Sequence, residues 1–269
     1  MSERTAAAVR ESPREIPSSL EAVRLLAGLS LRRTRRGRLF WLTAVILALP
    51  VAAALLALIS GHGGVPFFDE LLGVFLRYLA PFIMALHAPA TVAEEVTGKT
   101  ITYLFSRPVA RWTLPLGKYL GNLAVNAVLM LAALALIYVF SMIGERDALV
   151  LELPRLAMGL FALLLAAVLF GAMATAFGTM VTGFPFVATL IYVLIVEVGF
   201  SFVPGWFKVT AMTVHLRAIA GLYRPKESMW LSDPQLTLGV SLPVVLALAA
   251  GWLLIAIAWV GSTEYRTDK

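Results

Sequence analysis

The sequence contains no cysteine, only three histidines and few charged residues, and each scarcity removes a class of function. Without cysteine the chain has no disulfide framework and no thiolate metal site. The histidines lie far apart at His62, His87 and His215, and neither an HExxH zinc motif nor a GxSxG nucleophile motif occurs. We therefore expect a chain that binds no metal and is not an enzyme by itself.

Charged residues make up only 14% of the chain, whereas hydrophobic residues make up 60%. Soluble domains contain about 45–50% apolar and about 25% charged residues. Several apolar runs approach the roughly 20 residues that a helix needs to cross about 30 Å of hydrocarbon. A backbone that faces lipid must satisfy its own hydrogen bonds, which favours helices. The predicted fold class is an all-α polytopic membrane protein.

The apolar runs predict six transmembrane helices. The first is too long for a signal peptide and ends without an A-x-A cleavage site, so we expect it to be retained. We predict a disordered cytoplasmic tail at 1–19 and a single transmembrane domain at 20–269. The predicted spans lie at about 40–60, 71–93, 119–143, 156–180, 185–203 and 237–260.

The distribution of positive charge predicts the orientation in the membrane. With the N-terminus inside, the cytoplasmic segments contain 15 lysines and arginines and the outer segments contain six. The positive-inside rule therefore places both termini in the cytoplasm, and we expect the cytoplasmic (inner) membrane as the location. The net charge of +6 suits an anionic lipid surface, and no nucleic-acid-binding module is visible.

Two further segments are predicted to lie at the membrane surface. Residues 20–38 place apolar residues at helical spacing and end with five arginines between Arg32 and Arg38, which predicts an amphipathic interfacial helix. The alternative is that these arginines only set the topology. The outer segment 204–236 mixes Trp206 and other apolar residues with charges, which predicts short helices at the outer interface.

Two charged residues fall inside predicted spans, where each is costly. Arg77 and Glu197 both lie about 9 Å from the outer ends of their spans, at 1.5 Å per residue. They are a candidate ion pair, or two polar walls of a translocation path that includes His87 near the cytoplasmic end. The alternatives are snorkelling of Arg77 to the interface and a structural hydrogen bond of Glu197.

Small residues recur at helix-packing spacing in two of the predicted spans. They form Gly117-x-x-x-Gly121, Gly171-x-x-x-Thr175 and Ala174-x-x-x-Gly178. Such spacing allows close approach of helix backbones and is common in membrane proteins. It is therefore only weak support for a dimer interface.

The tripeptide Gly98-Lys99-Thr100 matches the end of the phosphate-binding motif GxxxxGK[ST]. That motif needs a glycine five positions before Gly98, where the chain has Ala93, and a preceding strand rather than a membrane helix. No other GK[ST] occurs, so we expect no ATP binding by this route.

The segment between predicted spans two and three is about 25 residues long, and most connections are far shorter. Ile101, Leu104 and Phe105 fall on one helical face, and Pro108 should end a helix at about Arg107. We predict a short amphipathic cytoplasmic helix, then a proline break and a basic lead-in at Arg111 and Lys118. The alternative is a solvated connector.

The residues of this segment resemble the cytoplasmic segment of type-2 ABC export permeases. The resemblance rests on two adjacent acids, Thr100-Ile101, Tyr103-Leu104-Phe105, Ser106-Arg107-Pro108-Val109, Arg111 and Leu116-Gly117-Lys118. The chain departs from the family pattern at Gly98, which lies one place early, with Lys99 before Thr100. Six spans and a basic N-terminal helix fit the same family.

The resemblance implies the membrane-spanning subunit of an ATP-driven exporter, with a short coupling helix that docks on a separate ATPase. It implies two ATPase copies, a second permease copy as homodimer or paralogous heterodimer, and ATP and Mg²⁺ bound by the ATPase rather than by this chain. The substrate is not readable. The residues implied at the ATPase-coupling surface are Glu94, Glu95, Thr100, Ile101, Leu104, Phe105, Arg107, Pro108 and Arg111.

Two other functions fit the sequence less closely. One is a secondary, ion-coupled transporter that uses Arg77 and Glu197, and it would work without an ATPase. The other is a membrane scaffold or assembly factor, which would show no substrate-stimulated ATP hydrolysis.

Overall fold

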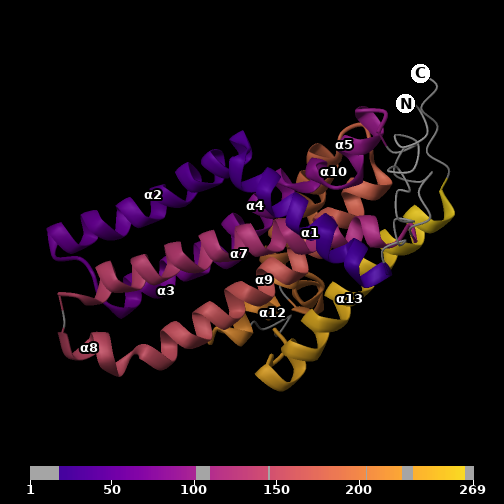
Figure 1. Cartoon of the computed structure of the whole chain (residues 1–269). Helices are drawn as coiled ribbons and strands as arrows, with labels where there is room; N and C mark the ends of the chain where they lie inside the picture. Colours follow the sequence, from indigo (N-terminus) through magenta and orange to yellow (C-terminus); the bar gives the residue numbers. More distant parts are fainter. Residues whose placement is uncertain (1–17, 101–109, 145, 204, 226–232, 264–269) are drawn as a thin grey trace, which may run out of the picture.

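A computed structural model describes residues 18–100, 110–144, 146–203, 205–225 and 233–263, and every regular element in these ranges is helical (Figure 1). Five helices are long and apolar enough to cross a membrane, which confirms an all-α, multi-pass membrane protein. They are α2 (Arg38–Ser60), α7 (Thr113–Met142), α9 (Leu153–Met180), the composite helix Pro185–Phe202 and α13 (Leu238–Ser262).

The composite helix contains a stretch of π-helix. It consists of α10 (Pro185–Tyr192), the π-helix η3 (Val193–Gly199) and α11 (Phe200–Phe202). Only four residues connect α9 and α10, and the two helices pack together.

The predicted second span is helical but differs from the prediction at both ends. The helix begins at Val65 and runs without a break through α3 (Val65–Val74), the π-helix η1 (Phe75–Leu79) and α4 (Ala80–Leu86). It carries Asp69, Glu70 and Arg77 and is not one of the five spanning helices, so a sixth crossing stays a prediction.

The second span ends before residue 93 because Pro89 cannot donate a backbone hydrogen bond and restricts Ala88 before it. A 3₁₀ turn, η2 (Ala88–Ala90), therefore follows His87, and Thr91 departs from helical geometry with φ −93° and ψ −122°. A new short helix, α5 (Val92–Thr97), begins immediately after Thr91.

Helix α9 is central to the bundle and contacts α4, α7, α10, α12 and α13. In Figure 1, α7 and α9 run alongside each other, and the short helix α8 (Arg146–Leu151) connects them at the end of the bundle opposite α5. The largest fully buried side chains form one core between these helices: Phe68, Leu72, Phe75, Leu76, Ile83, Met84, Met130, Leu134, Ile137, Tyr138 and Phe170.

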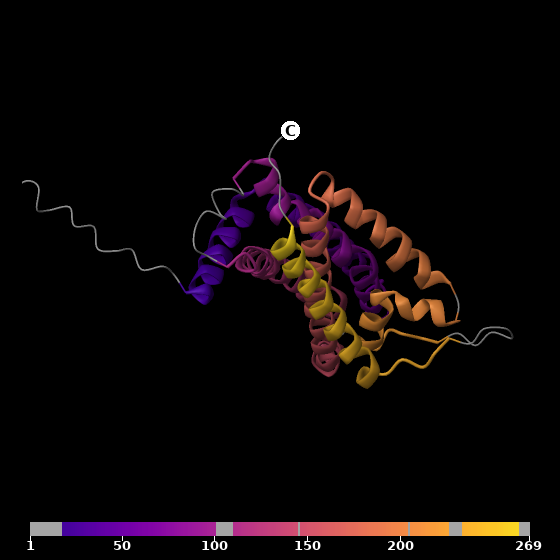
Figure 2. The same cartoon turned by 90° about the vertical axis from the view of Figure 1, so that its right-hand side faces the viewer.

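Helix α1 (Ser19–Arg36) is present where the sequence predicts the N-terminal helix. A capping box begins it: Ser18 Oγ accepts from Glu21 N at 3.3 Å, and the Glu21 carboxylate accepts from Ser18 N at 2.8 Å. Figure 2 shows α1 on the flank of the bundle, where it packs on α7. Its location at a membrane interface remains a prediction.

The predicted small-residue motifs pack helices within this chain. A Cβ on Gly121 would lie 2.6 Å from the Ala27 carbonyl oxygen of α1, and one on Gly178 would lie 1.9 Å from Thr91 Oγ1. Glycine is therefore required for α1 to approach α7 and for η2 to approach α9. Both contacts are intramolecular, so these motifs no longer support a dimer interface.

The predicted outer segment contains short helices, as expected. They are the 3₁₀ helix η4 (Gly205–Thr210) and α12 (Met212–Ile219), and α12 packs against α9 and α13. Trp206 and Phe207 on η4 are highly exposed. Their position at a membrane interface is a prediction.

Candidate functional site

The predicted coupling segment begins with helix α5, which ends at Thr97. Residues 101–107, which carry the predicted apolar face and its end at Arg107, lie outside the described residues, so the rest of the predicted helix stays a prediction. The Thr100 N–H donates to the Glu95 carbonyl oxygen at 2.9 Å and the Lys99 N–H to that of Val96 at 3.1 Å, which is the pattern of a Schellman motif. Lys99 takes the left-handed position with φ 56°.

The Schellman motif explains the displaced glycine of this segment. Glycine normally occupies the left-handed position, but here Gly98 is one place early and Lys99 occupies it. The Thr100 hydroxyl donates to a carboxylate oxygen of Glu95 and fixes the end of the turn. Helix α5 therefore ends before the residues that carry the predicted apolar face.

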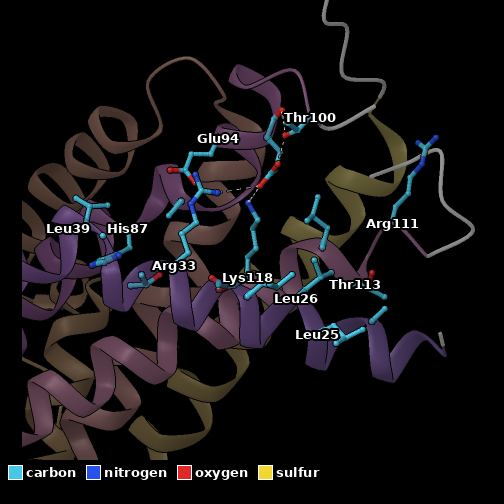
Figure 3. A pocket seen from close by; sticks show the side chains of 18 of the residues that line it. Leu25, Leu26, Arg33, Leu39, His87, Glu94, Thr100, Arg111, Thr113 and Lys118 are labelled. Atoms are coloured by element: carbon cyan, nitrogen blue, oxygen red, sulfur yellow. Dashed lines mark hydrogen bonds and ion pairs between the residues drawn. The ribbon is translucent and has the colours of Figure 1, made fainter. Parts of the chain in front are cut away.

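Two basic side chains from neighbouring helices hold the acidic residues of α5. Arg33 of α1 contacts Glu94 at 3.1 Å and Glu95 at 3.7 Å between guanidinium nitrogen and carboxylate oxygen. Lys118 of α7 contacts Glu95 Oε1 at 2.6 Å and donates to the Thr91 carbonyl oxygen at 2.7 Å. Figure 3 shows Arg33 and Lys118 pointing toward these acids. We call Arg33, Glu94, Glu95 and Lys118 the acid–base cluster.

The strongest contact of the acid–base cluster is largely withdrawn from water. Lys118 is only 7% exposed, and a charge so buried needs a charged partner with good geometry. Burial alone would raise the pKa of Glu95. Hydrogen bonds from Lys118 and Thr100 and the charges of Lys118 and Arg33 outweigh burial, so the pKa lies below its usual value. Glu95 and Lys118 therefore form an ion pair at neutral pH.

Three polar residues, Ser30, Thr34 and Asn122, also connect α1 to α7, and we call them the polar seam. Asn122 Oδ1 accepts hydrogen bonds from Ser30 Oγ at 3.1 Å and Thr34 Oγ1 at 2.8 Å, and all three residues are buried. Arg33 lies between these two hydroxyl residues in the sequence of α1. The seam therefore fixes the rotation of α1 that directs Arg33 toward α5.

Replacing Asn122 with alanine should loosen α1, because the Thr34 hydroxyl loses its acceptor and the Ser30 hydroxyl keeps only the Lys118 carbonyl oxygen of α7 at 3.4 Å. We expect a loss of about 1–3 kcal/mol and faster proteolysis within α1. Asn126→Ala is the matched control, since the Asn126 amide donates within its own helix, to the Asn122 carbonyl oxygen, and has no hydrogen bond to α1 among the described residues. Thermal unfolding and limited trypsin cleavage of the full chain measure both effects. Equal proteolysis of the two variants would contradict the role of the seam.

A cavity of about 970 Å³ lies between α1, α5 and the start of α7. Leucines of α1, including Leu25, Leu26 and Leu29, form its apolar wall, and the acid–base cluster lies at its rim. Figure 3 shows Arg111 set apart from Glu94, on the other side of this cavity. The cavity therefore joins several predicted coupling residues in one concave surface, with Glu94, Glu95, Thr100 and Arg111 among its lining.

The structure does not cover the whole predicted coupling surface. Ile101, Leu104, Phe105, Arg107 and Pro108 lie outside the described residues. Arg33 and Lys118 were not predicted at this surface. Lys118 stands in the Leu116-Gly117-Lys118 motif, but no local pattern connects Arg33 to acids about sixty positions later.

The predicted intramembrane residues do not come together as a pair. Among the residues that the structure describes, no ion pair joins Arg77 to Glu197. Glu197 is fully buried and its Oε2 accepts from the Thr213 N–H at 2.9 Å, which is the structural hydrogen bond considered as the alternative. His87 is also buried, with Nε2 3.2 Å from Thr43 Oγ1 of α2.

The depth of a residue along a predicted span could not reveal that Glu197 binds a backbone N–H of α12 rather than Arg77. The π-helices η1, which carries Arg77, and η3, which carries Glu197, do contact each other. The short helix α12 contacts η1, and its Thr213 N–H, rather than Arg77, is the donor to the Glu197 carboxylate. Whether any of these residues lines a translocation path stays a prediction.

Comparison with known proteins places these features in a family. Residues 31–196, more than half of the chain, match the family model of the ABC-2 family transporter proteins. The chain belongs to the ABC-2 transporter family. The match confirms the resemblance seen in the coupling segment, and it includes the whole acid–base cluster of this permease. No curated protein matches the permease.

Membership of this family makes the chain a membrane transport subunit and implies an ABC ATPase as partner in general. The matched region begins inside α1 and ends just before Glu197. It contains Arg33, Lys118 and the whole of α5, whereas most of α1 and all of α12 and α13 lie outside it.

Proposed function

We propose that this permease is the membrane-spanning subunit of an ATP-binding-cassette exporter, with ATP hydrolysed by two separate ATPase subunits. In this proposal ATP and Mg²⁺ bind the ATPases, both termini are cytoplasmic, and a second permease copy completes the pathway through the cytoplasmic membrane. The transported substrate is unidentified. The observation that carries the proposal is the attachment of α5 to two other helices by the acid–base cluster, within the region that matches the family.

The attachment of α5 is suited to transmitting a force. A push on α5 acts through Glu95 and Lys118 on α7, and through η2 on α4 and α9. A rigid short helix in contact with spanning helices is what coupling to a moving ATPase requires. The ATPase-facing surface in this proposal consists of Glu94, Glu95, Thr100 and Arg111 with the predicted residues Ile101, Leu104, Phe105, Arg107 and Pro108.

The proposal predicts that a tagged permease, purified from the membranes of its own host, carries a P-loop ATPase with it. Arg111→Glu should reduce the recovered ATPase by about tenfold, since charge reversal at a contact costs on the order of 1–2 kcal/mol. Arg24→Glu on the exposed face of α1 is the control and should leave recovery unchanged. Mass spectrometry of the purified complex and its ATP hydrolysis rate provide the measurement.

Two results would contradict the proposed function. One is that no ATPase accompanies the unaltered permease under mild detergent. The other is that transport by reconstituted permease continues without any ATPase, as expected of a secondary carrier.

A further inference from the structure

A second cavity, which is polar and has a volume of about 420 Å³, surrounds Arg77, one of the two charged residues inside predicted spans. Its lining includes Asp69, Glu70 and Arg77 of the helix Val65–Leu86 and Arg217 and Arg224 from α12 and the chain after it. The acid–base cluster does not contribute to this cavity. Asp69, Glu70, Arg217 and Arg224 belong to segments predicted to lie on the outer side, and Arg77 is predicted to lie about 9 Å inside the outer end of its span, at 1.5 Å per residue.

Positive charge in this cavity is not balanced by the acids that line it. Asp69 is already paired with Arg155, at 2.6 Å between carboxylate oxygen and guanidinium nitrogen, and Glu70 is exposed. Arg77 and Arg217 face the cavity without an ion pair among the described residues. The cavity therefore keeps an excess of guanidinium groups.

Both inner guanidinium groups retain unused donors. The Nε atoms of Arg77 and Arg217 are buried and have no hydrogen-bond partner in the part of the chain that is described. A buried donor without an acceptor costs about 1–3 kcal/mol, so an acceptor supplied by a ligand would be stabilising. Burial, and then the nearby charge of Arg77, lower the pKa of Arg217, as expected for two neighbouring cations without an anion between them.

The local backbone holds Arg77 in this position. Arg77 lies on the π-helix η1, and π-helical turns are frequent at functional sites. Its guanidinium carbon is 5.2 Å from the ring centroid of Phe202 and 5.8 Å from that of Tyr78. Stacking on these rings orients the guanidinium plane and leaves its nitrogens available for a planar or tetrahedral oxyanion.

Exposed aromatic residues surround the site. Phe202 is 62% exposed, and Trp206 and Phe207 are exposed on η4, which contacts both α11 and α12. Aromatic side chains are enriched at the level of lipid headgroups. A phospholipid could therefore place its phosphate at the arginines while its glycerol and acyl chains lie along the aromatic surface.

We propose that Arg77, Arg217 and Arg224 form a binding site for the phosphate group of a phospholipid headgroup on the predicted outer side of the bundle. Arg77 and Arg217 donate charge-assisted hydrogen bonds to the phosphate oxygens. Arg224 lies at the exposed rim and adds a third positive charge. The site is independent of ATPase docking at α5.

The test measures binding of a short-chain phosphatidylglycerol to the purified full chain in detergent, by the shift of thermal unfolding across a ligand titration. Diacylglycerol with the same chains lacks the phosphate and should give no saturable shift. Arg77→Gln and Arg217→Gln should each raise the Kd for the phospholipid by about tenfold or more, because each removes charged hydrogen bonds. Arg24→Gln, on exposed α1, is the matched control and should leave the Kd unchanged.

Two further experiments distinguish a loss of binding from a loss of folding, and binding of a lipid from binding of a free anion. If either inner variant fails to fold, Arg224→Glu at the exposed rim replaces it and should weaken binding at an unchanged unfolding temperature without lipid. Equal binding of diacylglycerol, or an unchanged Kd in the arginine variants, overturns the site. Inorganic phosphate that binds as tightly as the phospholipid, with the same dependence on Arg77, overturns the assignment to a lipid.

Discussion

Replacing Glu95 with alanine is expected to destabilise the permease by about 3 kcal/mol, because it leaves the Lys118 ammonium group buried without its carboxylate partner. The same change removes the acceptor of the Thr100 hydroxyl at the end of α5. We therefore expect α5 to detach from α7 and the recovered ATPase to fall with it. Unfolding in mixed micelles of increasing SDS content, followed by tryptophan fluorescence, measures the change in free energy.

Glu94→Ala is the matched control for Glu95→Ala. The two acids are adjacent and both contact Arg33, but Glu94 has no contact with buried Lys118 among the described ion pairs. Arg33 is well exposed, and exposed ion pairs contribute about 0–1 kcal/mol. Equal losses in the two variants would contradict the central role of the contact between Glu95 and Lys118.

The double variant Glu95→Gln with Lys118→Met tests whether the loss comes from an unpaired charge. Removing both charges should cost less than the sum of the two single changes, since no buried ion is left alone. Additive losses would instead indicate that the two residues act separately.

The contribution of Glu95 should also depend on pH in one direction. Its pKa is lowered in the folded permease, so its stabilising effect is fully present above the pKa of the unfolded chain. The effect is lost as the pH falls through the lower folded value. The difference in stability between the unaltered permease and Glu95→Gln should therefore be constant near neutral pH and shrink only in acid.

The sequence predicted the class of fold well because long apolar runs dominate it. The ends of four spans follow from those runs within three residues, whereas α7 begins at Thr113, six residues before the predicted start at 119. The link of four residues between α9 and α10 leaves no other arrangement than adjacent helices. The second span was less well predicted because its charges, Asp69, Glu70 and Arg77, interrupt the apolar pattern. The π-helices η1 and η3 have no recognised signal in the sequence.

The candidate site could be predicted only where its residues are close in sequence. Glu94, Glu95 and Arg111 were named from the order of residues in the coupling segment. Arg33 could not be named, because its position depends on how α1 packs on Gly117 and Gly121 of α7. An ion pair between Arg77 and Glu197 is not seen among the described residues for a similar reason: equal depth does not fix the direction in which two helices face.

Gly178→Ala is expected to have an effect as large as that of Glu95→Ala, although it adds only one methyl group. The added Cβ would lie 1.9 Å from Thr91 Oγ1 and 2.3 Å from the Ala88 carbonyl oxygen. A flexible side chain could yield, but the carbonyl belongs to the backbone of η2, which must then move away from α9. We expect a loss of about 3 kcal/mol, at the upper end of the cost of overpacking.

Intrinsic helix propensity favours the opposite result, so the sign of the stability change distinguishes the two effects. Alanine is favoured over glycine in a helix by about 1 kcal/mol, so the sign of the effect depends on the space around each glycine. Gly251→Ala in α13 is the control, because nothing lies within 4 Å of its added Cβ, and it should leave stability unchanged or raise it. Stabilisation by both variants would show that η2 does not approach α9 closely.

Removing the threonine side chain should rescue Gly178→Ala only in part. In the double variant with Thr91→Ala the hydroxyl contact disappears, but the contact with the Ala88 carbonyl oxygen remains. Thr91 also accepts from Lys118 through its backbone oxygen, so displacement of η2 pulls on the contact that attaches α5 to α7. We therefore expect Gly178→Ala to reduce the recovered ATPase as well, although Gly178 is not one of the predicted coupling residues. Full recovery of stability in the double variant would instead assign the whole effect to the hydroxyl.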